Sequence, residues 1–199
     1  MSEQRTAAGA AIAVLAVLTL AACTSTESGQ AAADGGYRAP TNNAGTIVLP
    51  PPPQNLSLAG VDPCALLTAA QLTGFAVQPG RSIGTDPLFK SPLCAFRFNT
   101  EAAGAEYAID AVTSAGVNYW LSPTLADTVT KVSVAGFPAV TVTSKNSLAT
   151  GCETAVGVAT GQMLIVNDGV QPHDVTVPQS CARTQQVAAA ALTTLLTLK

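Results

Sequence analysis

The chain of 199 residues is poor in charged and in aromatic side chains. Charged residues make up 11% of it and aromatic residues 5%, whereas about a quarter of a typical soluble protein is charged. The nine Lys and Arg residues are scattered singly in a chain of net charge −3. They form no cationic surface that could release counterions from nucleic acid, so we expect no nucleic-acid partner.

The signatures of several kinds of ligand site are missing as well. The sequence has no G-x-x-x-x-G-K-[ST] or G-x-G-x-x-G loop for phosphate groups and no EF-hand spacing for calcium. Its cysteines occur in no C-x-x-C pair, and it has a single histidine, which argues against a zinc site. We therefore expect neither a metal nor another cofactor.

The longest apolar run is Ala7 to Leu20, which is about fourteen residues. It is too short to span the bilayer core, for which a helix needs about 20 residues, but it suits the apolar region of a signal peptide. The run ends in Leu20, Ala21, Ala22 and Cys23, which resembles the bacterial lipobox. There the cysteine thiol receives a diacylglyceryl group, and the signal peptidase cuts the chain before it.

Residues 1–22 are therefore predicted to be a lipoprotein signal peptide, with Cys23 as the lipidated amino terminus that palmitate would label. Two or three acyl chains give stable anchoring, whereas one binds only marginally. This interpretation places the protein outside the cell, held on the outer face of the plasma membrane. The alternatives are an ordinary secretory signal with a chance cysteine and an uncut membrane anchor.

Residues 23–60 are rich in small, polar, Gly and Pro residues and show no lasting hydrophobic period. Such a composition cannot bury enough apolar surface to offset its ordering entropy, so we expect a flexible tether. Pro50 to Pro53 would form a short stiff spacer within it.

Apart from Cys23, the chain has four cysteines, an even number that favours disulfides in an exported protein. Four cysteines allow three pairings. Cys64 and Cys181 lie at predicted helix starts, whereas Cys94 and Cys152 lie at predicted strand starts. One helix start and one strand start in each half favour the pairs Cys64–Cys94 and Cys152–Cys181.

Residues 61–199 are predicted to form a single α+β domain. Asp62 and Pro63 suit the start of an N-terminal helix, and Ser180 is a candidate cap for a C-terminal helix that runs from Cys181. Between them, alternating segments predict an antiparallel sheet of five to six strands that both helices cover. The turn signals Gly136-Phe137-Pro138 and Asn167-Asp168-Gly169 separate or end strands. The predicted strand segments lie at 95–98, 107–111, 131–134, 139–143, 153–159 and 163–166.

The domain resembles an actinobacterial lipoprotein family, the domain of unknown function 3558. The likeness spans about residues 61–199 and depends on Asp62-Pro63-Cys64, on Cys94 before a strand and on Gly136-Phe137-Pro138. It also depends on Cys152 and on Cys181 before an Ala/Leu helix, although Gln179-Ser180 stands where many members have Asp-Pro. The resemblance implies an extracytoplasmic surface lipoprotein and no particular reaction.

The residues that could carry chemistry are few. His173 next to Asp174 is expected to be a solvated turn residue, because neighbours in a turn point apart and catalytic triads form across a fold. Glu101, Glu106 and Asp110 are the densest acidic set and are expected on a solvated face.

Tyr119 and Trp120 could line a ligand groove or could simply close the core. We therefore expect no catalytic residue and a non-enzymatic lipoprotein that binds an envelope component or a protein. The alternatives are an extracytoplasmic hydrolase whose acids converge only in the fold, and a spacer without a ligand.

Overall fold

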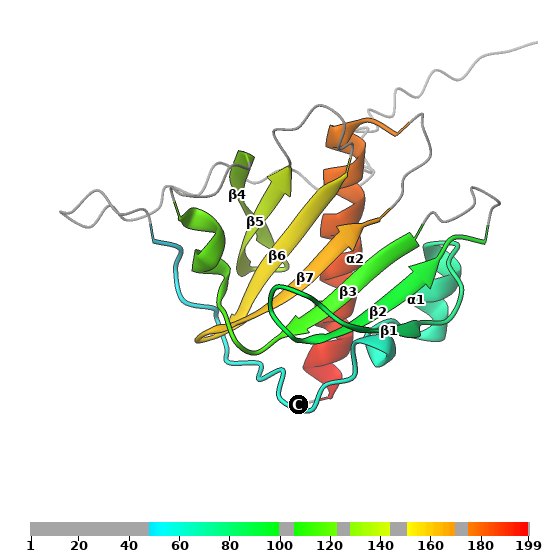
Figure 1. Cartoon of the computed structure of the whole chain (residues 1–199), viewed down its shortest axis with the longest axis horizontal. Coiled ribbons are helices and arrows are strands. Elements are labelled where there is room, and N and C mark those ends of the chain that lie inside the picture. The colour runs from blue at the N-terminus through cyan, green and yellow to red at the C-terminus, as the bar shows by residue number, and fades with distance from the viewer. Residues whose placement is uncertain (1–47, 100–105, 123–127, 144–150, 170–174, 199) are drawn as a thin grey trace, which may run out of the picture. The chain divides into compact units, whose positions relative to one another are not determined.

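The computed structural model describes residues 48–99, 106–122, 128–143, 151–169 and 175–198. Its centre is a seven-stranded sheet in which every neighbouring pair of strands is antiparallel, in the order β1-β2-β3-β7-β6-β5-β4 (Figure 1). The strands are β1 (Arg81–Thr85), β2 (Pro92–Arg97), β3 (Glu106–Val112), β4 (Thr128–Val134), β5 (Phe137–Thr143), β6 (Cys152–Ala159) and β7 (Gln162–Asp168).

One face of the sheet, here called the helix face, packs against the C-terminal helix α2 (Val177–Thr197). This helix brings a stripe of buried residues to the sheet because apolar residues recur at its 3.6-residue period. Strand residues of one parity, such as Ile109 and Leu164, complete this core. The buried apolar residues of the helix are Val187, Ala188, Ala191, Leu192 and Leu195.

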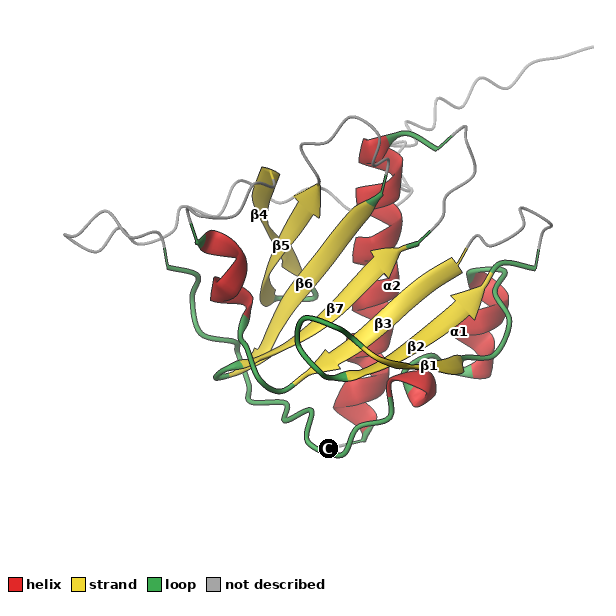
Figure 2. Cartoon of the chain, in the orientation of Figure 1, coloured by secondary structure: helices red, strands yellow, loops and turns green. Residues whose placement is uncertain are grey.

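The opposite face, here called the open face, carries a second and smaller apolar cluster. The 3₁₀ helix η2 (Val117–Leu121) packs here through Val117 and Trp120 (Figure 2). Beneath it lie strand residues of the other parity, including Val140, Met163 and Ile165. Side chains alternate across a strand, so the two clusters lie on opposite sides of one sheet.

The sheet has seven strands and not the five to six predicted, because the sequence does not predict β1. All five residues of β1 are exposed, so no hydrophobic alternation marks it. Its pairing with β2 is also irregular between Ser82 and Gly84, and Gly84 adopts a φ of +100° that suits glycine. It is a polar edge strand that the period-2 pattern cannot detect.

The predicted N-terminal helix is not one helix. Asp62 does accept a hydrogen bond from the Cys64 N–H at 2.9 Å, but it caps only the 3₁₀ turn η1 (Pro63–Ala65). Thr68 then caps a separate six-residue helix, α1 (Ala69–Gly74). Its hydroxyl oxygen accepts a hydrogen bond from the Gln71 N–H, and its own N–H donates to Gln71 Oε1 at 2.7 Å. Neither piece is long enough to cover the sheet as α2 does.

The start of α2 also differs from the prediction. Thr176 rather than Ser180 is its N-cap, and Thr176 N donates to Gln179 Oε1 at 2.9 Å. The predicted turn at Asn167-Asp168 is the end of β7, and the predicted turn at Phe137-Pro138 is the start of β5. The hairpin turn is Ala135-Gly136, whose φ values are +50° and +81°, as a two-residue loop requires.

The folded domain begins before the predicted boundary at residue 60. Leu49, Leu56 and Leu58 are all at most 5% exposed. Leu56 N donates to Val158 O at 2.8 Å, and Leu58 N donates to Gln162 Oε1 at 2.6 Å. Leu49 belongs to the open-face cluster and Leu56 to the helix-face cluster, so this segment passes from one face of the sheet to the other (Figure 2).

Candidate functional site

Two disulfides brace the fold, and they join the pairs that the sequence favoured. Cys64 of η1 is bonded to Cys94 of β2, and Cys152 of β6 is bonded to Cys181 of α2. The pairs are 30 and 29 residues apart in sequence. Each disulfide therefore closes a loop worth about 3–4 kcal/mol in the chain-entropy account, and each ties a helical element to the sheet.

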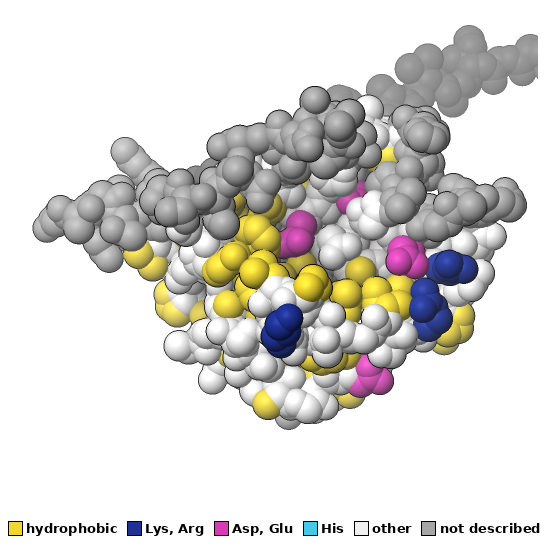
Figure 3. All heavy atoms as spheres, in the orientation of Figure 1, with side chains coloured by type: hydrophobic (Ala, Val, Ile, Leu, Met, Phe, Trp, Pro, Cys, Tyr) yellow, Lys and Arg dark blue, Asp and Glu magenta, His cyan; other side chains and the backbone are white. Residues whose placement is uncertain are grey.

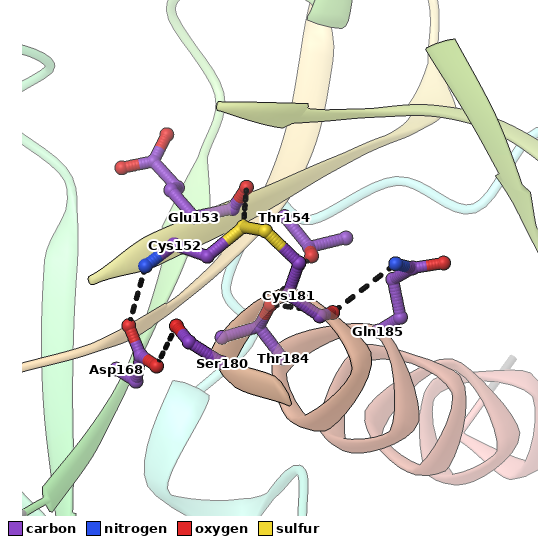
Figure 4. Close-up of a disulfide and its surroundings, with 8 residues drawn as sticks. All are labelled: Cys152, Glu153, Thr154, Asp168, Ser180, Cys181, Thr184 and Gln185. Carbon is purple, nitrogen blue, oxygen red and sulfur yellow. Dashed lines mark hydrogen bonds between the residues drawn. A yellow bond between two sulfur atoms is a disulfide. The ribbon is translucent and has the colours of Figure 1, made fainter. Parts of the chain in front are cut away.

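A buried carboxylate supports the second disulfide (Figure 4). Asp168 is 4% exposed; its Oδ1 accepts a 2.7 Å hydrogen bond from the Cys152 N–H, and its Oδ2 accepts one from the Ser180 hydroxyl. Burial raises the pKa of Asp168, and these two hydrogen bonds partly offset the rise because they stabilise the charged form. Asp168 thereby joins the ends of β6, β7 and α2.

The aromatic residues of the open face come together from two segments. Phe89, in the loop between β1 and β2, lies 5.1 Å from Tyr119 and 6.3 Å from Trp120, measured between ring centroids. Tyr119 lies 5.3 Å from Trp120, and all three contacts are edge-to-face. Asp86 holds this loop in shape, since its Oδ1 accepts hydrogen bonds from the N–H groups of Leu88 and Phe89 at 2.7 and 2.6 Å.

Beside this cluster the open face is hollowed. The hollow has a volume of about 310 Å³, and Trp120 and Val142 form its apolar wall. Its polar side chains on the open face are Glu153 and Asn167, which are direct cross-strand partners on β6 and β7. Gly151, Cys152 and Asp168 complete the lining. Figure 3 shows hydrophobic side chains gathered around a carboxylate on the face that is turned away from α2.

The two carboxylates of this lining serve different faces. Glu153 belongs to the open-face parity and points away from α2, whereas Asp168 points toward Ser180 on the helix side (Figure 4). Both oxygens of Asp168 already accept hydrogen bonds. Glu153 is the carboxylate of the lining that lies on the open face.

Trp120 adds a donor to the same region. It is 9% exposed, and its Nε1 has no hydrogen-bond acceptor among the residues that the structure describes. Buried polar groups in native proteins are nearly always paired with protein, water or ligand. Trp120 therefore combines an apolar wall with an N–H that a bound molecule could use.

Asp110 contradicts the prediction of a solvated acidic face. It is 2% exposed, and in the sheet it stands between Leu93 of β2 and Ile165 of β7. Burial raises its pKa to about 6, the neighbouring Ser91 hydroxyl lowers it slightly, and the charge of Asp86 raises it. Even so, neither Asp110 Oδ1 nor Ser91 Oγ forms a hydrogen bond of standard geometry within the described chain.

Among the described acids, Glu106 and Glu153 occupy positions apart from Asp110. Glu106 lies opposite Arg97, with a 3.8 Å distance between Arg97 Nε and Glu106 Oε2 in a partly exposed ion pair. Asp110 and Glu153 share the open face but lie on strands that β7 separates, two positions apart along the ladder. That places their Cα atoms about 12 Å apart. His173, Asp174 and Glu101 lie outside the described residues.

Residues Gly80 to Gly84 carry the G-x-S-x-G spacing of a hydrolase nucleophile elbow, which sequence reasoning overlooked. The structure places Ser82 in the edge strand β1, paired with Cys94. A nucleophile elbow needs its serine on a strained turn between a strand and a helix. Ser82 is not among the residues with positive φ, so the spacing here is coincidental.

Cys23 and the lipobox residues Leu20, Ala21 and Ala22 also lie outside the described residues. Within the described ranges, no helix is long and apolar enough to cross a membrane. The same ranges hold no cluster of three or more His, Cys, Asp or Glu side chains that could bind a metal ion.

The fold and its bridges define a disulfide-braced α+β domain with one covered and one hollowed face of the sheet. The family model described as "Protein of unknown function (DUF3558)" matches residues 18–194, so the chain belongs to that family. The match begins before the predicted lipobox and extends almost to the end of α2. No curated protein and no solved structure matches the chain.

Proposed function

We propose that this chain is a lipoprotein held on the outer face of the plasma membrane through a lipid on Cys23. The observation that carries the proposal is the division of its five cysteines. Four form two disulfides, which persist in oxidising compartments outside the cytoplasm. The fifth stands directly after Leu20, Ala21 and Ala22, where a lipoprotein is acylated.

We propose further that the domain is non-enzymatic and binds an envelope component in the hollow of the open face. Ligand sites are mostly apolar pockets with a few polar groups, and their volumes begin at about 300 Å³. The hollow reaches this volume, and its lining is about half apolar, from Trp120 and Val142, and half polar, with Glu153 and Asn167 on the open face. An indole wall beside a carboxylate and an amide suits a small polar ligand with both apolar and hydroxyl-bearing surfaces, such as a sugar unit.

The geometry gives the hydrolase alternative no specific support. Asp168 is committed to Cys152 and Ser180, and Glu106 is paired with Arg97. Asp110 and Glu153 lie on strands that β7 separates, with Cα atoms about 12 Å apart, so they are not direct neighbours in the sheet.

Labelling with a palmitate analogue tests the anchor. The wild-type chain should incorporate the label and sediment with membranes, whereas the Cys23→Ala chain should incorporate none, because the acylated thiol is removed. Equal labelling of the two chains would refute the anchor and leave the binding proposal standing.

Site-specific photocrosslinking in the native envelope tests the hollow. A photoreactive residue in place of Asn167 should capture a component that the same residue in place of Thr193, exposed on α2, does not capture. Glu153→Lys should abolish this capture, because it reverses the charge in the hollow. Identical crosslinks from both positions, or capture that survives Glu153→Lys, would contradict ligand binding there.

A further inference from the structure

An exposed apolar surface adjoins the hollow and shares Trp120 with it. We call it the aromatic patch, and it consists of Leu88, Phe89 and Tyr119 at the surface and of the buried Trp120, which contacts both aromatic rings. Leu88 is 57% exposed at the tip of the β1–β2 loop. Phe89, the next residue in the chain, is half-buried, and its ring contacts the half-buried ring of Tyr119. A leucine so exposed beside two aromatic rings is typical of a surface that contacts something apolar.

The described chain begins on the same side of the domain. Leu49 belongs to one apolar cluster with Trp120, and Phe89 and Tyr119 pack against that cluster. Leu49 N also donates to Asn118 Oδ1 of η2 at 3.5 Å. The described chain therefore begins beside the aromatic patch and on the face of the sheet opposite α2.

The segment between the proposed anchor and residue 48 is short. Residues 24–47 number 24, and a coil of that length spans about 27 Å between its ends. A domain of about 150 residues has a radius of gyration of about 15 Å, so this coil is comparable with the domain's own diameter. A bilayer at the far end of the coil is thus within reach of the surface from which the coil departs.

We propose that the aromatic patch rests on the interface of the phospholipid bilayer in which the chain is anchored. This inference depends on the proposed lipid on Cys23. Tyr and Trp concentrate at membrane interfaces, where the ring is in apolar surroundings and its polar group meets water. Leu88 supplies an apolar side chain at the tip, and Lys90, exposed two residues later, can reach the headgroups with its ammonium group.

Because the chain is tethered to the bilayer, a weak affinity of the aromatic patch for the membrane is sufficient for docking. Binding that follows anchoring is intramolecular, and a short flexible linker gives an effective concentration in the millimolar range. Because Lys90 is the cation that the patch region contributes, docking depends mainly on apolar contact. It should therefore persist at high salt, which screens charge. The domain would then lie with the patch on the membrane and the hollow just above the headgroups.

The sole tryptophan of the chain gives a direct test, because Trp120 lies in the patch. The full chain, purified from cells with any lipid that it carries, is reconstituted into vesicles of phosphatidylglycerol and of a phosphatidylcholine whose acyl chains carry bromine near the headgroups. Flotation with the vesicles reports the anchor, and quenching of Trp120 fluorescence by bromine reports docking. The wild-type chain should float and be quenched at low and at high salt.

Variants at exposed positions separate docking from folding. Leu88→Asp should still float but should lower the ratio of docked to undocked chain by about five- to tenfold, because it replaces apolar contact with a charge. Leu198→Asp is the matched control, since Leu198 is 55% exposed near the end of α2, and it should leave quenching unchanged. Leu88→Trp should increase quenching by placing a second indole at the tip.

Each outcome decides a different proposal. A chain that does not float refutes the lipid anchor, and the docking inference falls with it. A chain that floats without quenching, or equal quenching in wild type and Leu88→Asp, overturns docking and leaves the anchor intact. Equal loss of quenching in Leu88→Asp and Leu198→Asp would also overturn it, because the effect would then not belong to the patch.

Discussion

Asp110 offers a stability test whose sign and size follow from its position. This carboxyl group stands between Leu93 and Ile165 on the open face and is 2% exposed. Burial raises its pKa from 3.8 to about 6. At about 1.36 kcal/mol for each pH unit, this rise corresponds to about 3 kcal/mol.

The direction of the effect follows from proton linkage. The folded chain holds the Asp110 proton more tightly than the unfolded chain does, because its folded pKa is the higher one. The stabilisation from protonated Asp110 is therefore complete below pH 3.8 and is lost as the pH rises through about 6. At neutral pH the fold carries the cost of a buried carboxylate.

Asp110→Asn removes this cost without changing the size of the side chain. The variant should be more stable than wild type at pH 7.5, by up to about 3 kcal/mol, and nearly equal to it at pH 4. Urea unfolding of both chains at several pH values measures the difference. The pKa of Asp168 is also raised, but Asp168 is present in both chains. The difference between their free energies of unfolding therefore reports on Asp110 alone.

Parallel stability curves for the two chains between pH 4 and 7.5 would refute this reasoning, because they would show that Asp110 titrates alike in the folded and unfolded states. A variant that is less stable than wild type at pH 7.5 would refute it too. It would mean that the charged form is the favoured one in the fold.

Two further changes should alter the free energy of unfolding, measured with urea. A Cβ on Gly80 would lie 2.7 Å from Cys94 Sγ, so Gly80→Ala should destabilise the fold by about 1–3 kcal/mol. In contrast, a Cβ on Gly74 in α1 would meet open space, so Gly74→Ala should stabilise the fold by about 0.5–1 kcal/mol. Replacing Cys152 and Cys181 with alanine should cost about 3–4 kcal/mol, and a loss below about 1 kcal/mol would contradict the chain-entropy account.

Six of the seven strands could be predicted because they alternate or form compact apolar runs. Strands β3 and β5 show this well, since their buried residues recur at period 2 on the helix face. Strand β1 has five exposed residues and gives no such signal. The sequence offers Ser180 as a cap for α2, but the helix begins earlier because Thr176 and Gln179 form a capping box before it.

Burial without a period is harder to predict. Leu49, Leu56 and Leu58 stand among prolines and polar residues, and each is buried by a different part of the fold. The segment has no helix or strand, so its apolar residues follow no period, and composition alone suggested a tether. Leu56 is held instead by its N–H bond to Val158 O in β6.

The sequence names Trp120 as a possible groove residue, but it does not reveal Glu153, Asn167 or Phe89 beside it, for a related reason. Strand alternation placed Asp110 opposite Ile109, but it does not tell whether that second face meets water or another layer. Here η2 and the β1–β2 loop cover part of it. The available signal was Trp120, whose size calls for a partner, but Phe89 lies 31 positions earlier in the sequence and only the fold brings the two rings together.

The Cys152–Cys181 disulfide on the helix face and the hollow on the open face are built on the same ends of strands β6 and β7. Cys152 and Glu153 are neighbours on β6, and Asn167 and Asp168 are neighbours on β7, so each pair points one side chain to each face. The disulfide to Cys181 fixes Cys152, and hydrogen bonds fix Asp168. Because alternation leaves the adjacent side chain no other direction, fixing these two residues also sets the directions of Glu153 and Asn167. A disulfide that holds α2 thus also orients the polar groups of the proposed ligand site.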